Sequence, residues 1–150
     1  MKHLFENHDF VTERGSQLID VTDDVMAAVE RADVENGMAL VYSPHTTCAI
    51  VINEREAGFF EDFNDLLAEL APSERYYRHD DLAIRTEGIE SDTAEYPNGH
   101  SHLRGGLLSS SSQTIPIVDR KLMLGTWQHI FFCELDRSRP RKLFIQVIGE

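Results

Sequence analysis

The connections between apolar segments in the last third of the sequence constrain the fold most strongly. Three segments of strand-forming composition lie there: residues 114–118, 121–134 and 142–148. Only Asp119 and Arg120 separate the first two, and a short connection at residues 136–141 joins the last two. Because a parallel return needs roughly a dozen residues or more, these strands are expected to pair antiparallel. The middle segment is expected to bend at Gly125.

The rest of the chain predicts helices and further strands. Apolar residues at helical spacing predict three helices. The first has Thr22 as its cap, an apolar stripe from Val25 to Ala32 and a stop at Asn36-Gly37. The other two cover residues 56–71 and 98–108. Short apolar runs predict strands over residues 38–42 and 46–52, and two more around Gly15 between residues 10 and 21. Strands outnumber helices, which predicts an α+β fold: an antiparallel β-sandwich with helices packed against it. A length of 150 residues fits one domain, residues 1–150.

The charge balance restricts the partners that the protein can have. The sequence carries 14 basic and 26 acidic residues, a formal net charge of −12. Such a charge argues against a nucleic-acid groove or an anionic membrane surface as partner. Residues 96–150 are the exception, with seven basic and four acidic residues. A small anionic ligand is therefore expected to find its attractive charges in the last third of the chain.

Neither a membrane segment nor a disulfide framework is expected. No apolar run reaches the roughly 20 residues that span a bilayer, and the N-terminus lacks the pattern of a signal peptide. Cys48 and Cys133 lie inside apolar runs without CxxC spacing, so they are expected to be reduced thiols in the core. These features favour a cytoplasmic protein.

Three of the seven histidines lie among polar residues suited to a site: His45, His79 and His102. Neutral imidazole is the commonest metal ligand, and three imidazoles with an open fourth position form a catalytic zinc centre. The three are far apart in the sequence and form no local motif, so ordinary surface or hydrogen-bonded histidines are the alternative. If they converge, they predict a site for a divalent metal, with zinc favoured.

His79 lies in a long polar segment, residues 73–97. Loops longer than about 12–15 residues are usually functional or mobile, which favours a functional interpretation of this one. Asp80 and Asp81 follow His79 directly and could orient an imidazole from behind it. Two solvated acids in an exposed loop are the alternative.

Polar residues also mark the predicted strand over residues 121–134. Alternation places Thr126, Gln128 and Glu134 on one face and Trp127 on the other, where Trp127 is expected to pack in the core. An unpaired buried polar group costs roughly 1–3 kcal/mol, so Gln128 and Glu134 need partners. A ligand site or a contact between subunits would supply them.

The serine run over residues 109–112 follows a predicted helix that carries Arg104. Its hydroxyls and amides, those of Ser112 included, could bind an anion together with Arg104. A solvated loop is the alternative interpretation of this segment.

Several motifs occur together along the chain: Pro44-His-Thr-Thr through Asn53-Glu54, Tyr77-Arg-His79, Asn98 through Leu103, Leu124-Gly-Thr-Trp-Gln128 and Glu134-Leu-Asp136. In this combination and order they resemble the YjbQ family, often labelled secondary thiamine-phosphate synthase enzymes. The resemblance covers the chain from about residue 15 onward. Two departures are the serine run at 109–112, where the family has a Gly-x-Ser turn, and Asp119-Arg120, where its hairpin has Asp-Gly.

The resemblance implies a compact α+β sandwich, a homotrimer, and a site near the subunit boundaries. In that site His45, His79 and His102 would gather around a metal. Six further positions match the family's motifs and would line or support the site: Asn53, Glu54, Asn98, Thr126, Gln128 and Glu134.

The family label names a reaction that joins a hydroxymethylpyrimidine diphosphate to a thiazole phosphate. Such chemistry usually uses Mg²⁺ on carboxylates with basic residues around the diphosphate, whereas this sequence offers histidines and net negative charge. That contrast favours thiamine-phosphate synthesis as a secondary activity. The first hypothesis is therefore a metal-dependent enzyme acting on a small phosphorylated metabolite, with Glu134 or Glu54 as proton carrier. The alternative is a non-catalytic homotrimer that binds a metabolite or a metal.

Overall fold

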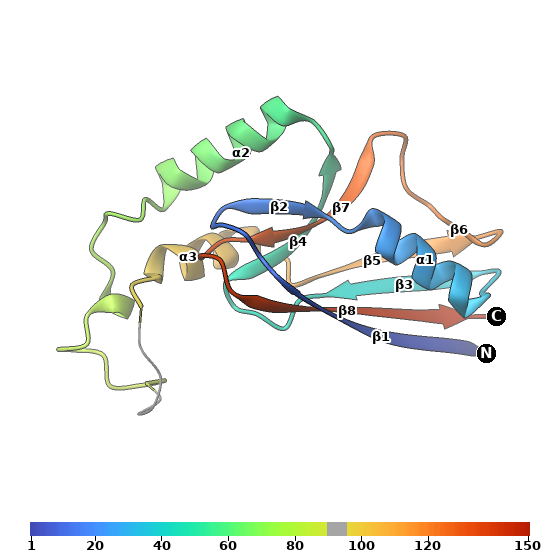
Figure 1. Ribbon diagram of the computed structural model, residues 1–150, viewed down its shortest axis with the longest axis horizontal. Coiled ribbons are helices and arrows are strands. Elements are labelled where there is room, and N and C mark those ends of the chain that lie inside the picture. Colours follow the sequence, from blue (N-terminus) through green and yellow to red (C-terminus); the bar gives the residue numbers. More distant parts are fainter. Residues whose placement is uncertain (90–95) are drawn as a thin grey trace.

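A computed structural model describes residues 1–89 and 96–150 of the chain (Figure 1). The strands are β1 (Lys2–Val11), β2 (Gln17–Asp20), β3 (Gly37–Tyr42), β4 (Cys48–Glu54), β5 (Ser112–Val118), β6 (Lys121–Leu122), β7 (Gln128–Glu134) and β8 (Pro140–Gly149). The helices are α1 (Thr22–Ala32), α2 (Ala57–Leu70) and α3 (Gly99–Leu108), with a 3₁₀ turn, η1, at Arg78–Asp80.

The strands form two antiparallel sheets. The five-stranded sheet has the order β1-β8-β3-β5-β6, and the three-stranded sheet has the order β2-β7-β4. Asp119 and Arg120, which join β5 to β6, have φ angles of 50° and 64°. A two-residue hairpin whose turn matches the strand twist requires positive φ at both central residues. The predicted antiparallel pairing and the predicted α+β sandwich are both confirmed.

The main core lies between the two sheets. Ile50 and Phe132 of the three-stranded sheet and Ile145 of the five-stranded sheet are fully buried in it. The apolar stripe of α1, which includes Val25 and Val29, packs into the same core. Cys48 and Cys133 are buried free thiols, as predicted.

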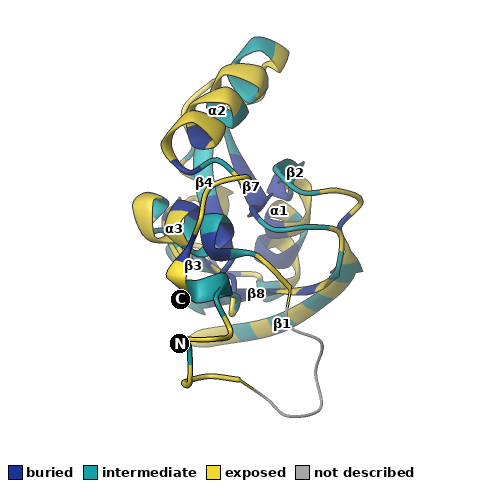
Figure 2. Ribbon diagram, turned by 90° about the vertical axis from the view of Figure 1, so that its left-hand side faces the viewer, coloured by how far each residue is buried: buried dark blue, intermediate teal, exposed yellow. Residues whose placement is uncertain are grey.

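Helix α2 covers the outer face of the three-stranded sheet. The ring of Phe60 meets the ring of Phe131 edge-on, with their centroids 5.3 Å apart, and Leu67 is buried beside them. The Glu56 carboxylate accepts hydrogen bonds from the amides of Gly58 and Phe59 and so fixes the start of the helix. Figure 2 shows that most of the α2 surface away from this contact is exposed.

The outer face of the five-stranded sheet, in contrast, is covered by none of the described helices. Phe144 lies there with its ring centroid 5.4 Å from that of Phe5 and 6.1 Å from that of Tyr42. Phe5 is 55% exposed and Tyr42 is 38% exposed. This aromatic group is open to solvent in the isolated chain.

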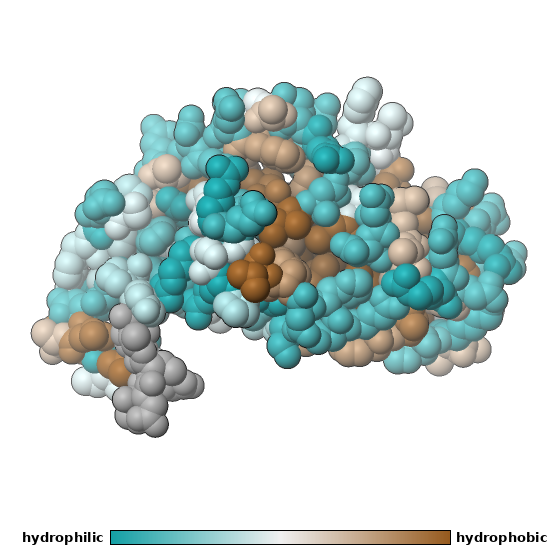
Figure 3. Space-filling view, viewed as in Figure 1, coloured by the Kyte–Doolittle hydropathy of each residue, from teal (hydrophilic) through white to brown (hydrophobic). Residues whose placement is uncertain are grey.

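The core also reaches the surface at a hollow of about 390 Å³ between β1, β2 and α1. Phe10, Ile19, Val21 and Leu143 line it. Figure 3 shows hydrophobic side chains in the middle of this face, surrounded by hydrophilic ones. No helix in the described ranges has both the length and the apolar composition needed to cross a bilayer.

Two strand predictions need correction. β1 begins at Lys2, well before Phe10, because its in-register pairing with β8 sets its length rather than a continuous apolar run. The predicted bent strand over 121–134 is two strands, β6 and β7. Gly125 and Gln128 close a turn between them, in which the Gly125 amide donates to Gln128 Oε1 and the Gln128 amide donates to the Gly125 carbonyl.

Three smaller predictions also change. Trp127, predicted to pack in the core, lies in that turn and is 70% exposed. Thr22 is the first residue of α1 rather than its cap, and its amide and hydroxyl donate to Asp20 Oδ1. The predicted loop over residues 73–97 contains η1, and its residues 90–95 lie outside the described part of the chain.

Candidate functional site

A cavity of about 500 Å³ lies at the end of the sandwich where β4 begins and β7 ends. Its wall is formed by Pro44, His45, Thr46, Thr47, His79, Arg85, Gly88, Tyr96, Asn98, His102, Arg137, Arg139 and Arg141. The loop before β4, η1, the start of α3 and the segment entering β8 each contribute residues to it. The structure therefore brings His45, His79 and His102 to one cavity, although they are far apart in the sequence.

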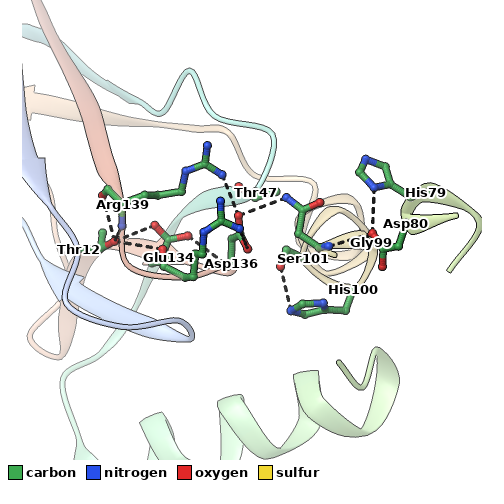
Figure 4. Close-up of polar contacts among 12 residues, drawn as sticks. Thr12, Thr47, His79, Asp80, Gly99, His100, Ser101, Glu134, Asp136 and Arg139 are labelled. Carbon is green, nitrogen blue, oxygen red and sulfur yellow. Dashed lines mark hydrogen bonds and ion pairs between the residues drawn. The ribbon is translucent and has the colours of Figure 1, made fainter. Parts of the chain in front are cut away.

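His79 and His102 lie against each other. Their ring centroids are 4.3 Å apart and the ring planes are inclined by 34°. His79 Nδ1 forms a hydrogen bond of 3.2 Å with Asp80 Oδ1, which orients the ring (Figure 4). Burial, and then the neighbouring His79, lower the pKa of His102 below its ordinary value. His102 is therefore neutral at pH 7.

Asp80 joins η1 to the start of α3. Its Oδ1 accepts hydrogen bonds of 2.9 Å from the amides of Asn98 and Gly99, which are amides at the helix N-terminus (Figure 4). Burial opposes ionisation of Asp80, but these amides and His79 outweigh it, and the pKa of Asp80 lies below its ordinary value. Asp80 thus holds the two elements that carry His79 and His102.

His45 is fixed by the backbone of β8. Its Nε2 accepts a hydrogen bond of 2.9 Å from the amide of Lys142, so the proton of the neutral ring is on Nδ1. Burial, followed by the positive charge of Arg141, lowers the pKa of His45. His45 lies in the loop before β4.

Arg141 and Glu134 form a buried ion pair below the cavity. Their side chains are 3% and 0% exposed. Arg141 Nε donates to Glu134 Oε2 at 2.6 Å and Nη2 donates to Oε1 at 2.5 Å. Nη2 also donates to the hydroxyl of Thr47 at 3.0 Å. Glu134, predicted as a proton carrier, is thus bonded to a guanidinium.

Two more arginines lie at the rim, where Asp136 and Tyr96 hold them. Arg139 Nη1 donates to Asp136 Oδ2 at 2.9 Å, and the Asn98 side-chain amide donates to the same oxygen at 3.3 Å. The Arg137 guanidinium lies 3.7 Å from the centre of the Tyr96 ring, a cation–π contact. With Arg85 and Arg141, they place four guanidinium groups on a single cavity wall.

The predicted zinc centre requires the three histidines to converge on one point. Within residues 1–89 and 96–150, no three histidine, cysteine, aspartate or glutamate side chains are placed to hold one metal ion. His45 directs Nε2 at the Lys142 amide, and the rings of His79 and His102 face each other. As placed, the three histidines share a cavity, and the predicted metal centre would require their rings to turn toward one point.

The other predicted residues divide into three places. Asn98 lies on the cavity wall, as described above. Asn53, Glu54 and Gln128 lie at the opposite end of the β4–β7 ladder, where Glu54 pairs with Gln128, and Thr126 lies in the adjoining turn. Arg104 is buried elsewhere, with Nε donating to the Ala71 carbonyl and Nη1 to the Ser16 hydroxyl. Ser112 is exposed at the start of β5.

The sequence interpretation missed the arginines. Arg137, Arg139 and Arg141 occupy every second position in the segment that enters β8. In an extended strand, that spacing would turn side chains to the same side. The basic character of residues 96–150 and this spacing together could have located them. Arg85 donates to the carbonyls of His79 and Gly88. Neither spacing nor local charge in the sequence marks Arg85 as a residue of the cavity wall.

Comparisons with known proteins identify the family. The model of the family described as "UPF0047 protein YjbQ-like" matches residues 6–150. A UPF0047 protein of Archaeoglobus fulgidus is 38% identical over 137 residues, which cover 91% of this chain and 95% of that protein. UPF0047 protein YugU of Bacillus subtilis is 32% identical, covering 92% and 94%.

Solved structures agree with this assignment. A YbjQ-like protein of unknown function from Sulfolobus solfataricus superposes with a TM-score of 0.85 at 32% identity, covering 99% of both chains. A hypothetical protein from Aeropyrum pernix superposes with a TM-score of 0.83 at 32% identity, covering 98% of this chain and 99% of that one. Fold, sequence and motifs point the same way, and this chain belongs to the YjbQ-like UPF0047 family.

Proposed function

We propose that this protein is a cytoplasmic enzyme that binds a small phosphorylated metabolite in the cavity and acts at its phosphoryl group. The observation that carries the proposal is that four guanidinium and three imidazole groups line one cavity of about 500 Å³ in a chain of net charge −12. Guanidinium groups bind phosphate oxygens with charge-assisted hydrogen bonds. The buried free cysteines support a reducing compartment.

The histidines supply the proton transfer that such chemistry needs. Neutral His102 accepts a proton from an attacking water or hydroxyl group in this proposal, because its lowered pKa leaves it unprotonated at pH 7. As the attacking oxygen bonds to phosphorus, the bond from phosphorus to the leaving oxygen of the ligand breaks. His79, oriented by Asp80, is the group that can give that leaving oxygen a proton. The arginines bind the charge that develops on the phosphoryl oxygens. This mechanism favours a hydrolase or a transferase.

Phosphate binding tests the first half of the proposal. Calorimetric titration with inorganic phosphate at constant ionic strength should give saturable binding. Arg139→Gln should weaken it about five- to tenfold, because it removes one guanidinium from the wall. Arg120→Gln removes the same charge from an exposed ion pair with Asp33 and is the matched control. Equal loss in both variants, or no saturable binding, would contradict the proposal.

Turnover tests the second half. Phosphorylated metabolites are incubated with the wild type and with His102→Gln, and phosphate release or transfer is measured. The panel includes a thiazole phosphate with a hydroxymethylpyrimidine diphosphate, which tests the secondary thiamine-phosphate synthase activity. Turnover that His102→Gln loses while still binding phosphate supports the enzyme. Binding without turnover of any compound supports the alternative, a non-catalytic metabolite-binding protein.

Binding of a divalent metal, zinc above all, by His45, His79 and His102 is a separate proposal. The cavity wall that the three histidines share supports it, and the neutral imidazole is the form that binds metals. The rings would have to turn toward a common point. Metal content of the purified protein should approach one ion per chain and fall in His102→Ala, with His3→Ala as control. Full metal retention in His102→Ala would remove this proposal.

Assembly into a homotrimer is the remaining proposal. The uncovered face of the five-stranded sheet, with Phe5, Tyr42 and Phe144, supports it because monomers rarely expose a contiguous apolar patch of such composition. Light scattering should give three times the chain mass. Tyr42→Glu should lower that mass, whereas Tyr76→Glu, an exposed tyrosine away from this face, should not. A monomeric wild type would exclude the trimer.

A further inference from the structure

Arg141 differs from the other arginines of the cavity in being both buried and fixed. Its side chain is 3% exposed, whereas those of Arg137 and Arg139 are 38% and 40% exposed. Nε and Nη2 are both bonded, to the two oxygens of Glu134 and to Thr47. One edge of the planar guanidinium is therefore occupied, and the plane cannot rotate without breaking these bonds.

The third nitrogen of the same group, Nη1, forms none of these hydrogen bonds. In the part of the chain that the structure describes, Nη1 has no hydrogen-bond acceptor. It is not fully buried either, because the fully buried side-chain atoms that lack a partner there are Ser43 Oγ and Asn64 Oδ1. Nη1 is therefore reached by solvent, and Arg141 lines the cavity. Because Arg141 lines the cavity, the two N–H groups of Nη1 are the donors of this buried guanidinium that remain for a ligand there.

Glu134 is held as firmly as the arginine that it holds. Oε1 accepts from Arg141 Nη2 and from the Asp136 amide at 2.9 Å, and Oε2 accepts from Arg141 Nε and from the Thr12 hydroxyl at 3.0 Å (Figure 4). A carboxylate has about four acceptor positions, so this one is fully used. Glu134 has no direct access to a ligand, although the sequence suggested that it carries a proton.

We propose that Arg141 binds the phosphoryl group of the ligand through Nη1 and that Glu134 is the positioning residue that aims it. The inference rests on the proposed function, which places a phosphorylated metabolite in this cavity. The half-exposed arginines at the rim then add attraction, while Arg141 sets where the phosphoryl oxygen lies. Preorganisation of this kind favours binding because no side chain has to be immobilised when the ligand arrives.

A double-mutant cycle with inorganic phosphate as the probe tests this inference. Phosphate affinity is measured by calorimetry for the wild type, Glu134→Gln, Arg141→Lys and the double variant, each checked for folding by circular dichroism. Lysine keeps the charge of residue 141 but lacks the fork that Glu134 holds. Glutamine at 134 turns an N–H group toward the guanidinium. Each single variant should bind phosphate about tenfold more weakly or worse.

The coupling between the two changes separates a positioning role from a merely structural one. If Glu134 acts through Arg141, Glu134→Gln has no further effect in the Arg141→Lys background, and the double variant binds like Arg141→Lys. If the two losses multiply, Glu134 acts by another route and the inference is overturned. Glu134→Asp, which keeps the charge but shortens the side chain, replaces Glu134→Gln if the latter does not fold. Glu61→Gln, the same chemical change on the exposed face of α2, is the control.

The remaining outcomes distinguish this inference from the proposed function. Wild-type binding that both Arg141→Lys and Glu134→Gln retain would leave phosphate binding in place and overturn the role of Arg141. No phosphate binding by the wild type would overturn the proposed function and, with it, this inference.

Discussion

The two ends of the β4–β7 ladder carry similar polar side chains but differ in surroundings. At one end, where Cys48 pairs with Glu134, the polar groups are buried, paired and joined to a cavity. At the other end, where Glu54 pairs with Gln128, they are exposed. Six residue steps along an extended strand separate Glu134 from Gln128, which is about 20 Å. One strand therefore serves two environments.

This difference shows that residue type alone does not mark a site. Glu54 and Glu134 are both carboxylates at the end of largely apolar strands, and the sequence suggested the same role for both. Among the described residues, Glu134 is the one of the two with a cation within hydrogen-bond distance from another strand. What distinguishes the cavity end is the number of elements that meet there.

The largest expected effect is on stability at the cavity end. Arg141→Met leaves the Glu134 carboxylate buried without its cation, which should lower the free energy of unfolding by roughly 3–5 kcal/mol. The counterpart is Arg55→Met, since Arg55 follows β4 at the opposite end and its side chain, 3.6 Å from Asp20, is 65% exposed. That change should cost no more than about 1 kcal/mol. Urea denaturation at pH 7 measures both, and equal losses would remove the distinction between the ends.

The next effect concerns the contact between η1 and α3. A Cβ at Gly99 would lie 2.5 Å from Cβ of buried Tyr77, so Gly99→Ala should destabilise the protein by roughly 1–3 kcal/mol. Gly106 is also in α3, but a Cβ there would meet nothing within 4 Å among the described residues, so Gly106→Ala should add about 0.5–1 kcal/mol. Thermal unfolding of the two variants should shift in opposite directions. A stabilised Gly99→Ala would mean that η1 does not pack on α3 as described.

The pH dependence of stability tests the buried histidines of the cavity end. Because the pKa of His102 is lowered in the folded state, mainly by burial, the unfolded chain binds the proton more readily below about pH 6.5. Stability should therefore fall as the pH drops from about 7.5 to about 5.5, by at most about 1.4 kcal/mol per pH unit for each such histidine, and less where solvent reaches the ring.

His102→Gln should reduce that slope, whereas His3→Gln, at an exposed position on β1, should keep it. Denaturation curves at several pH values give the slopes directly. A slope that does not change in His102→Gln would show that the ring titrates alike in the folded and the unfolded chain.

The smallest effect is expected at the opposite end of the ladder. Glu54→Gln should change phosphate affinity by less than about twofold and the free energy of unfolding by no more than about 0.5 kcal/mol, because Glu54 is exposed and about 20 Å from the end that bears the cavity. Calorimetry and urea denaturation measure both quantities. A tenfold loss of phosphate affinity would instead bring Glu54 to the site, as the sequence suggested.

Much of the fold followed from short connections and apolar spacing. The tight Asp119-Arg120 turn required antiparallel neighbours, and α2 follows from its regular apolar residues. The length of β1 could not be predicted in this way, because it depends on pairing with β8 at the other end of the chain. The exposure of Trp127 could not be predicted from the spacing of apolar residues either. The Gly125–Gln128 turn that contains Trp127 is closed by a side-chain hydrogen bond, which spacing does not reveal.

Residue type alone allowed part of the site to be predicted. Three polar-flanked histidines were singled out and do line one cavity. The partner of Glu134 was not foreseen. Glu134 ends β7 in one sheet and Arg141 begins β8 in the other, so their ion pair depends on how the two sheets pack. Nor could the sequence tell which of the matching polar residues lie at the other end of the ladder, since that depends on the direction in which each strand runs.

The most direct test of the account is a nuclear magnetic resonance titration of the imidazole signals with inorganic phosphate at fixed pH and ionic strength. The account predicts saturable shifts with a single affinity for His45, His79 and His102, which share the cavity wall. The signals of His3 and His129, which lie outside it, should stay where they are. Absence of saturable shifts at the three cavity histidines, or shifts of equal size at all five, would contradict the assignment of this cavity as a phosphate-binding site.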